Sequence, residues 1–141
     1  MQYLIKNGSV VNEGKIEQLD ILIDNNLISK IGKDISAASA TVIDASNSYI
    51  IPGIIDDQVH FREPGLTHKA NIYSESKAAV AGGVTSFMEQ PNTKPAALTQ
   101  ELLEEKYQIA AQTSLANYTF FMGTSNDNYD EVMRTDFNKV G

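Results

Sequence analysis

The chain has 141 residues, of which 42% are hydrophobic and 21% are charged, a composition typical of a soluble globular protein. It contains no cysteine, which excludes disulfides and thiolate metal sites, and its formal net charge of −7 argues against nucleic-acid binding. No apolar run approaches the roughly 18 to 20 residues of a membrane helix, and the first residues read as a strand, not as a signal peptide. We therefore expect a cytoplasmic protein without nucleic-acid or membrane partners.

Residues 1–50 alternate short apolar runs with turn residues, which predicts a series of short strands. Asn7-Gly8 is a strong hairpin signal, and Asp24-Asn25-Asn26 tolerates the left-handed backbone of a tight turn. So few short strands bury little apolar surface by themselves. We expect unpaired strand edges or an exposed apolar face on this lobe.

The residues after 50 alternate predicted strands with predicted helices. The opening strand starts at the Pro52-Gly53 corner, and the pattern then predicts strands at 84–88 and 117–122 and helices at 69–81, 99–113 and 129–137. Gly82-Gly83 suits a helix end, and Thr99 suits a helix N-cap. Strand and helix in this rhythm predict parallel βα units and an α/β fold.

A dense group of polar residues follows the apolar pair Ile54-Ile55. Such an apolar run is typical of a strand that is covered on both faces. Strand alternation would place Gln58, His60 and Arg62 on one face. Because barrel enzymes keep their chemistry at the carboxyl ends of parallel strands, the sequence predicts a functional site at the end of this strand.

Three segments in order carry a resemblance to a known family: Pro52-Gly-Ile-Ile-Asp-Asp-Gln-Val-His-Phe-Arg-Glu-Pro-Gly65, Ala81-Gly-Gly-Val-Thr85 and Gln90-Pro-Asn-Thr93. The first resembles the first barrel strand of the amidohydrolase superfamily, in particular its dihydroorotase and allantoinase branch. The other two are similar to the next landmarks of that branch. The resemblance implies a small β-sandwich lobe at residues 1–50 and the N-terminal part of a metal-dependent hydrolase TIM (β/α)8 barrel at residues 51–141.

The chain is too short to contain a complete barrel, which takes about 250 residues. The residues after 50 suffice for about three βα units. We therefore expect the incomplete, truncated N-terminal part of a longer enzyme. The resemblance implies a homodimer for the full-length parent.

By this resemblance, the parent protein is expected to be a zinc-dependent cyclic amidohydrolase. It would interconvert N-carbamoyl-L-aspartate and L-dihydroorotate, a small-molecule substrate pair, in de novo pyrimidine biosynthesis. His60 matches the second histidine of the family's His-x-His zinc pair, and imidazole suits zinc. Gln58 stands at the position of the first histidine, and an amide oxygen is a poorer zinc ligand. One or two zinc ions are therefore expected in the parent, and Gln58 leaves open a catalytically silent homologue that serves as a structural or binding partner.

The resemblance makes Arg62 and Asn92 the expected substrate-binding residues. Both dihydroorotate and carbamoyl aspartate carry a carboxylate, which a guanidinium group binds through two parallel hydrogen bonds. Allantoinases have asparagine where this chain has Arg62, and allantoin has no carboxylate. An allantoinase or hydantoinase is therefore the weaker alternative.

Other polar residues match no ligand position of the family. His68 is expected in an exposed loop, and Asp56 is expected to be a turn carboxylate or an indirect support of the site. The family's bridging carbamylated lysine or aspartate, its further histidines and its catalytic aspartate have no counterpart among these residues, and Lys139 stays unassigned. No catalytic residue is expected within this chain, and we expect the 141-residue chain to be inactive by itself.

Overall fold

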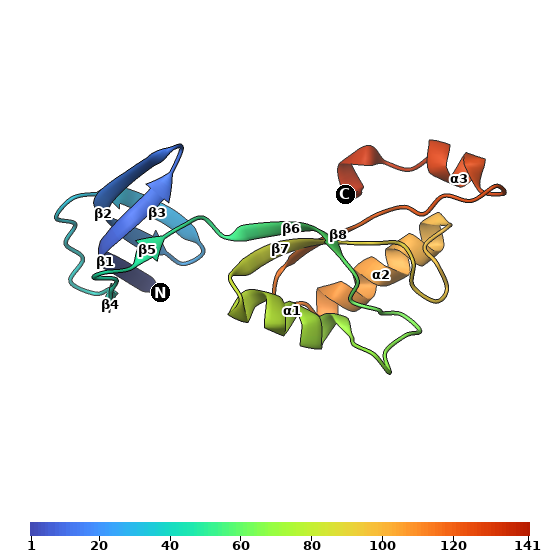
Figure 1. The fold of residues 1–141 in the computed structure, drawn as a ribbon, viewed down its shortest axis with the longest axis horizontal. Helices are drawn as coiled ribbons and strands as arrows, with labels where there is room; N and C mark the ends of the chain where they lie inside the picture. Colours follow the sequence, from blue (N-terminus) through green and yellow to red (C-terminus); the bar gives the residue numbers. More distant parts are fainter. The chain divides into compact units, whose positions relative to one another are not determined.

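A computed structural model describes all residues from Met1 to Gly141. They form two compact units, Met1–Pro52 and Gly53–Gly141 (Figure 1). The first unit is built from strands, and the second combines a parallel sheet with helices, which confirms the predicted α/β class. None of the helices has the length and apolar character needed to cross a membrane.

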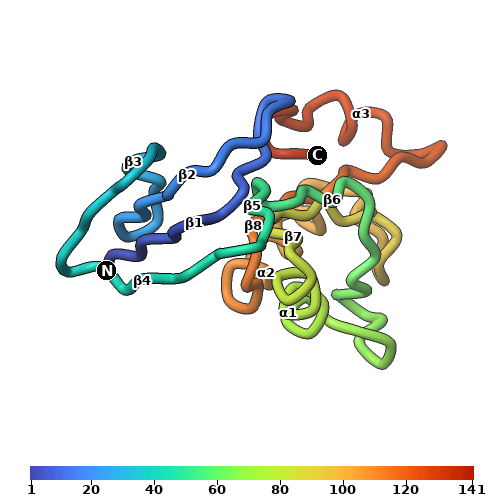
Figure 2. The backbone as a smooth tube through the Cα atoms, turned by 60° about the vertical axis from the view of Figure 1, so that its left-hand side comes forward, coloured from blue at the N-terminus to red at the C-terminus, as the bar shows by residue number.

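The first unit is one five-stranded sheet of order β3-β2-β1-β4, with β5 also paired to β1. Figure 2 shows β1 between β2 and β4. β1 to β3 are antiparallel neighbours, and β4 and β5 run parallel to β1. The strands are β1 (Gln2–Asn12), β2 (Lys15–Asp24), β3 (Leu27–Gly32), β4 (Thr41–Asp44) and β5 (Tyr49–Ile50).

The hairpin predicted at Asn7-Gly8 is wrong, because β1 continues through these residues to Asn12. Asn7 does take a left-handed backbone, with φ 64°, but it lies in a bulge of β1. Its N–H donates to Oδ1 of the buried Asp20 at 3.1 Å. The turn that joins β1 to β2 lies at Glu13-Gly14, where φ is 48° and 74°, and a turn at these two residues is also what the sequence predicts.

Within residues 1–52 all the strands join one sheet, so the expected β-sandwich lobe is not complete within these residues. A single sheet leaves apolar side chains uncovered. The exposed apolar residues on β3 and β4 are Leu27, Ile28, Ile31, Val42 and Ile43. The expectation of an exposed apolar face is therefore confirmed.

The second unit is a parallel sheet of order β6-β7-β8 with α1 and α2 packed against it (Figure 1). Its core is formed by Phe61, Ile72, Phe87, Leu103, Ala110 and Phe120. The elements are β6 (Ile54–Val59), α1 (Ile72–Ala81), β7 (Val84–Glu89), α2 (Gln100–Thr113), β8 (Asn117–Phe120), α3 (Tyr129–Met133) and a 3-10 turn at Phe137–Lys139.

Several predicted boundaries shift for local reasons. α1 starts at Ile72, later than predicted, because Asn71 is extended and its side chain accepts the Ser74 N–H at 2.8 Å. β8 ends at Phe120, which pairs with the last residue of β7. α3 ends at Met133, short of the predicted residue 137, because the backbone is again extended at Asp136.

β6 is less covered than its sequence predicts. Ile54 is 44% exposed and Ile55 is 63% exposed. Within the sheet only β7 pairs with β6, so β6 is an edge strand. The prediction of a strand covered on both faces is therefore wrong for these residues.

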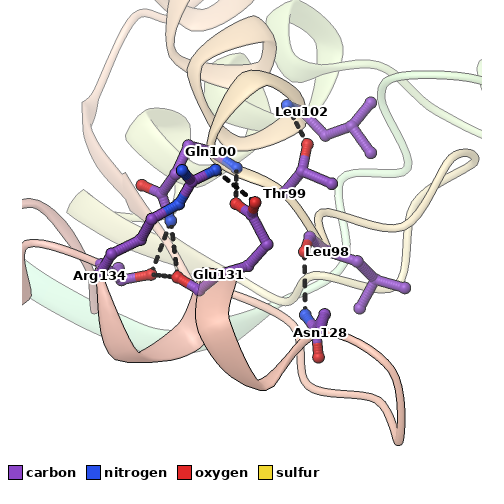
Figure 3. A network of polar contacts seen from close by, with 8 residues as sticks. Leu98, Thr99, Gln100, Leu102, Asn128, Glu131 and Arg134 are labelled. Atoms are coloured by element: carbon purple, nitrogen blue, oxygen red, sulfur yellow. Dashed lines mark hydrogen bonds and ion pairs between the residues drawn. The ribbon is translucent and has the colours of Figure 1, made fainter.

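Polar contacts attach α3 to the start of α2, as Figure 3 shows. Oε2 of Glu131 accepts the Gln100 N–H at 2.9 Å, at the end of α2 where backbone N–H groups lack helical partners. The Gln100 side chain donates to the carbonyl oxygen of Glu131 at 3.0 Å, and Arg134 pairs with the Glu131 carboxylate. Asn128 donates to the Leu98 carbonyl oxygen at 2.9 Å. The chain after β8 is thus held beside the loop that follows β7.

Candidate functional site

Polar side chains gather where β6 and β7 end. His60 directly follows β6, and Asn92 lies in the loop after β7. Because these neighbouring strands are parallel, their carboxyl ends meet at one edge of the sheet. Nδ1 of His60 lies 3.0 Å from Oδ1 of Asn92. An amide oxygen only accepts, so Nδ1 is the donor in this contact, and in a neutral imidazole Nε2 then keeps a free lone pair.

Strict strand alternation does not extend through Arg62. A bulge lies between Asp56 and Val59, and β6 ends at Val59. The Gln58 N–H donates to Oδ1 of Asp56 at 3.1 Å, so the Asp56 carboxylate stabilises the local backbone two residues along the chain. The Gln58 side chain is exposed. The directions of His60 and Arg62 are therefore set by local backbone contacts, not by pleating alone.

Arg62 has an unusual backbone conformation, with φ 73°. A left-handed backbone costs a residue with a side chain roughly 1–2 kcal/mol, and it persists only where neighbouring contacts enforce it. The Arg62 N–H donates to Oε1 of Glu89 at 3.0 Å, and its carbonyl oxygen accepts the Leu66 N–H at 3.0 Å. Glu89 is therefore one of the groups that fix this residue.

Glu89 itself forms a buried ion pair with Lys106. Glu89 Oε2 lies 3.1 Å from Lys106 Nζ, and each side chain is 1% exposed. Lys106 also donates to the Gln90 carbonyl oxygen at 3.0 Å, and its ammonium lies 4.9 Å from the centroid of the Phe120 ring. The last residue of β7 is thus joined to the middle of α2.

Burial disfavours both charges of this pair. It raises the pKa of Glu89 above the ordinary 4.5, against the opposing effects of Lys106 and of the N–H groups of Arg62 and Phe61. It also lowers the pKa of Lys106 below the ordinary 10.5, against the opposing effect of Glu89. Each charge therefore depends on the other, because neither reaches water.

Composition and charge pattern do not single out this pair, because charged residues usually lie on the protein surface. A signal was nevertheless present. Glu89 lies two residues after the core residue Phe87, so both side chains share one face of β7. Lys106 lies between Leu103 and Ala110, at the spacing of the buried face of α2.

The loop after Arg62 is closed by further backbone contacts. Glu63 Oε2 accepts the Ile72 N–H at 2.9 Å at the start of α1. Gly65 has φ 79°, and a Cβ added there would lie 1.7 Å from the Lys94 carbonyl oxygen. The backbones of the β6 and β7 loops are therefore in close contact at Gly65. His68 lies exposed in the loop, as predicted.

The residues of this chain do not make up a metal centre. No group of three or more His, Cys, Asp or Glu side chains converges in the structure. A structural zinc ion takes four ligands, and a catalytic one takes three from the protein. Near this edge the chain offers the His60 imidazole, with Gln58 as a poor donor two residues earlier. Zinc therefore does not fit these residues alone.

Comparison with known proteins identifies the family of this chain. Residues 47–139 match the family described as Dihydro-orotase-like. The chain belongs to this family. The dihydroorotase-like chain is 41% identical over 142 residues to a dihydroorotase of Lactococcus lactis subsp. lactis, covering 99% of this chain and 33% of that protein. It is 50% identical over 97 residues to a dihydroorotase of Carboxydothermus hydrogenoformans, covering 67% of this chain and 23% of that protein.

Solved structures support the same superfamily. An L-hydantoinase (dihydropyrimidinase) from Arthrobacter aurescens superposes with a TM-score of 0.86 at 28% identity, covering 92% of this chain and 29% of that one. The dihydroorotase-like chain spans a third or less of the length of these relatives. Its family is thus one of cyclic amidohydrolases.

Proposed function

We propose that this chain forms the carboxylate-binding side of a dihydroorotase active site. In this proposal Arg62 and Asn92 bind the carboxylate of L-dihydroorotate or N-carbamoyl-L-aspartate, and His60 is a metal ligand. The observation that carries the proposal is the 3.0 Å contact between His60 and Asn92 at the carboxyl ends of two parallel strands. Arg62 lies two residues after His60 and is held by its own backbone contacts.

The contact leaves each side chain free for a second task. Asn92 uses Oδ1 toward His60, so both N–H groups of Nδ2 remain for a substrate carboxylate. Arg62 adds a planar fork of donors, which grips a carboxylate through two parallel, charge-assisted bonds. The anionic end of the substrate would be held next to the imidazole, with the amide to be cleaved or formed on the His60 side.

The chain's own contribution in this proposal is binding and orientation. Zinc, when bound, would supply a water molecule that is a nucleophile at neutral pH. His60 is the one imidazole placed to ligate it, so we infer that the 141-residue chain alone does not hydrolyse dihydroorotate. In the whole enzyme, residues 51–141 would provide about three βα units of a TIM barrel, and residues 1–50 would belong to a β-sandwich lobe.

A second candidate function is favoured by Gln58. A neutral amide at the position of a zinc-binding histidine weakens a metal site, which suits a catalytically silent homologue that acts as a structural or binding partner. Such a protein would keep the fold of residues 54–141 without turnover.

An assay of the native gene product that contains these residues separates the candidates. Purified protein with added zinc is given L-dihydroorotate, and in parallel dihydrouracil and hydantoin, which lack the carboxylate. The proposal predicts turnover of dihydroorotate in preference to the two uncharged rings. No turnover of any substrate would favour the silent homologue, and a preference for the uncharged rings would favour a hydantoinase. Activity of the isolated 141-residue chain would contradict the inferred division of roles.

A further inference from the structure

Glu89 is the point at which three strand ends meet. Its Oε1 accepts the N–H of Arg62, just beyond β6, at 3.0 Å. The N–H of the preceding Phe61 also favours the charged carboxylate and opposes the rise of its pKa. Its carbonyl oxygen accepts the Phe121 N–H at 3.0 Å, just beyond β8. One residue at the end of β7 therefore bonds to the backbone on both sides of its own strand.

Lys106 fixes the direction of that carboxylate. Its Nζ lies 3.1 Å from Glu89 Oε2 in an ion pair, and this buried oxygen accepts no hydrogen bond. The ammonium is itself located by the Gln90 carbonyl oxygen at 3.0 Å and by the face of the Phe120 ring. Because both side chains are 1% exposed, the carboxylate cannot turn toward water without opening the core.

The contacts of Glu89 hold the backbone of Arg62 in an unfavourable conformation. Arg62 has φ 73°, a conformation that residues with a side chain rarely adopt. Two successive N–H groups, from Phe61 and Arg62, meet the same carboxylate. The backbone at these residues decides where the His60 imidazole and the Arg62 guanidinium leave the chain.

We propose that the buried Glu89–Lys106 pair is the positioning device of the substrate-binding loop. Glu89 holds the backbone of Phe61 and Arg62, and Lys106 holds Glu89. The device thereby sets the placement of Arg62 against Asn92 and His60. The proposal rests on the proposed function for its catalytic consequence, but its structural part is independent of it.

Two double variants of the 141-residue chain test the structural part. E89M/K106M replaces both charges with apolar side chains of similar size and removes the acceptor, whereas E89Q/K106M removes the charges and keeps an amide oxygen. Amide hydrogen exchange is measured by NMR at Phe61 and Arg62, with Phe120 as the reference for an intact core. We expect E89M/K106M to lose about 100-fold protection at Phe61 and Arg62 while Phe120 stays protected. E89Q/K106M keeps the acceptor but lacks Lys106, so we expect it to lose a smaller, intermediate amount of protection.

Unchanged exchange of Arg62 in E89M/K106M would overturn the proposal, as would an equal loss in both double variants. If E89M/K106M does not fold, the single variant Lys106→Met is used. It must then accelerate exchange at Arg62 more than at Phe120, and equal acceleration would contradict the device.

A control is Arg134, whose side chain is 58% exposed and pairs with Glu131. The variant Arg134→Met removes a positive charge from the same unit and leaves in place the contact of Glu131 with the Gln100 N–H. It should leave exchange at Phe61 and Arg62 unchanged. A loss of protection equal to that in E89M/K106M would show a general destabilisation and contradict the proposal.

The catalytic consequence is tested in the native gene product. We expect E89M/K106M to raise KM for dihydroorotate about tenfold more than KM for dihydrouracil, with a smaller increase in E89Q/K106M, which keeps the acceptor but lacks Lys106. If Arg62→Met discriminates between the two substrates and E89M/K106M does not, the positioning proposal fails and the proposed function stands. If Arg62→Met does not discriminate, the proposed function fails and the exchange data alone decide whether the device exists.

Discussion

Replacing Lys106 by methionine removes the ammonium group that faces Glu89 and keeps a side chain of similar length. The main cost is a carboxylate left unpaired in the core, because methionine fills most of the vacated volume. Removing one partner of a buried pair typically costs about 3–5 kcal/mol. We expect a loss in this range at neutral pH, because the two side chains are each 1% exposed and water cannot screen the charge.

The loss should depend on pH in a defined direction. Burial raises the pKa of Glu89, and Lys106 is the main opposing influence, so the substitution raises this pKa further. A carboxyl group whose folded pKa is raised destabilises the fold as pH rises through that pKa, and it has no such effect below its ordinary pKa of 4.5, where both states are protonated. The deficit of Lys106→Met relative to wild type should therefore be largest at neutral pH and shrink toward pH 4.5.

Urea unfolding at the two pH values measures this deficit. Amide NMR signals from residues 54–141 report on the second unit separately, because the two units need not unfold together. The exposed Arg134→Met serves as the control and should cost less than about 1 kcal/mol. A deficit for Lys106→Met below about 1 kcal/mol at neutral pH, or one that does not shrink in acid, would refute the reasoning.

Three further predictions concern the loops around the site. Gly65→Ala should destabilise the second unit by more than about 1 kcal/mol in thermal unfolding, because φ is 79° and the new Cβ would meet a backbone carbonyl; wild-type stability would contradict this. Asn128→Ala should cost about 1–3 kcal/mol, because two carbonyl oxygens lose their donor; a change within error would show that water replaces it. Long-range ¹H–¹⁵N NMR of the neutral imidazole should show the Nδ1–H tautomer for His60, and Asn92→Ala should remove this preference. His68 is the internal reference, and an unchanged His60 tautomer would contradict the contact.

The order of helices and strands in the second unit could be predicted, because each element depends on its local hydrophobic pattern and on the residues that cap its ends. Thr99 accepts the Leu102 N–H and α2 begins at the next residue, as its sequence predicts. Asn7 shows where local pattern fails. The same left-handed backbone suits a hairpin turn or a bulge, and the choice is made by Asp20, which is distant in sequence.

The candidate site likewise contains residues that the sequence predicts and residues that it does not predict. His60 and Asn92 stand out in the sequence, and the structure brings them into contact. For Glu89 and Lys106 the spacing indicates that each lies on a buried face, but only tertiary packing shows that the two charges meet there. The left-handed backbone of Arg62 could not be predicted either, since its N–H contacts Glu89, which is distant in sequence.

The most direct test of the account is the substrate preference of Arg62→Met in the native gene product, with Arg134→Met, the only other arginine substitution this chain offers, as the control. The account predicts that kcat/KM for dihydroorotate falls about 100-fold relative to that for dihydrouracil, since two charge-assisted hydrogen bonds to the carboxylate are lost. Equal effects on the two substrates would contradict the assignment of Arg62 as the carboxylate-binding residue.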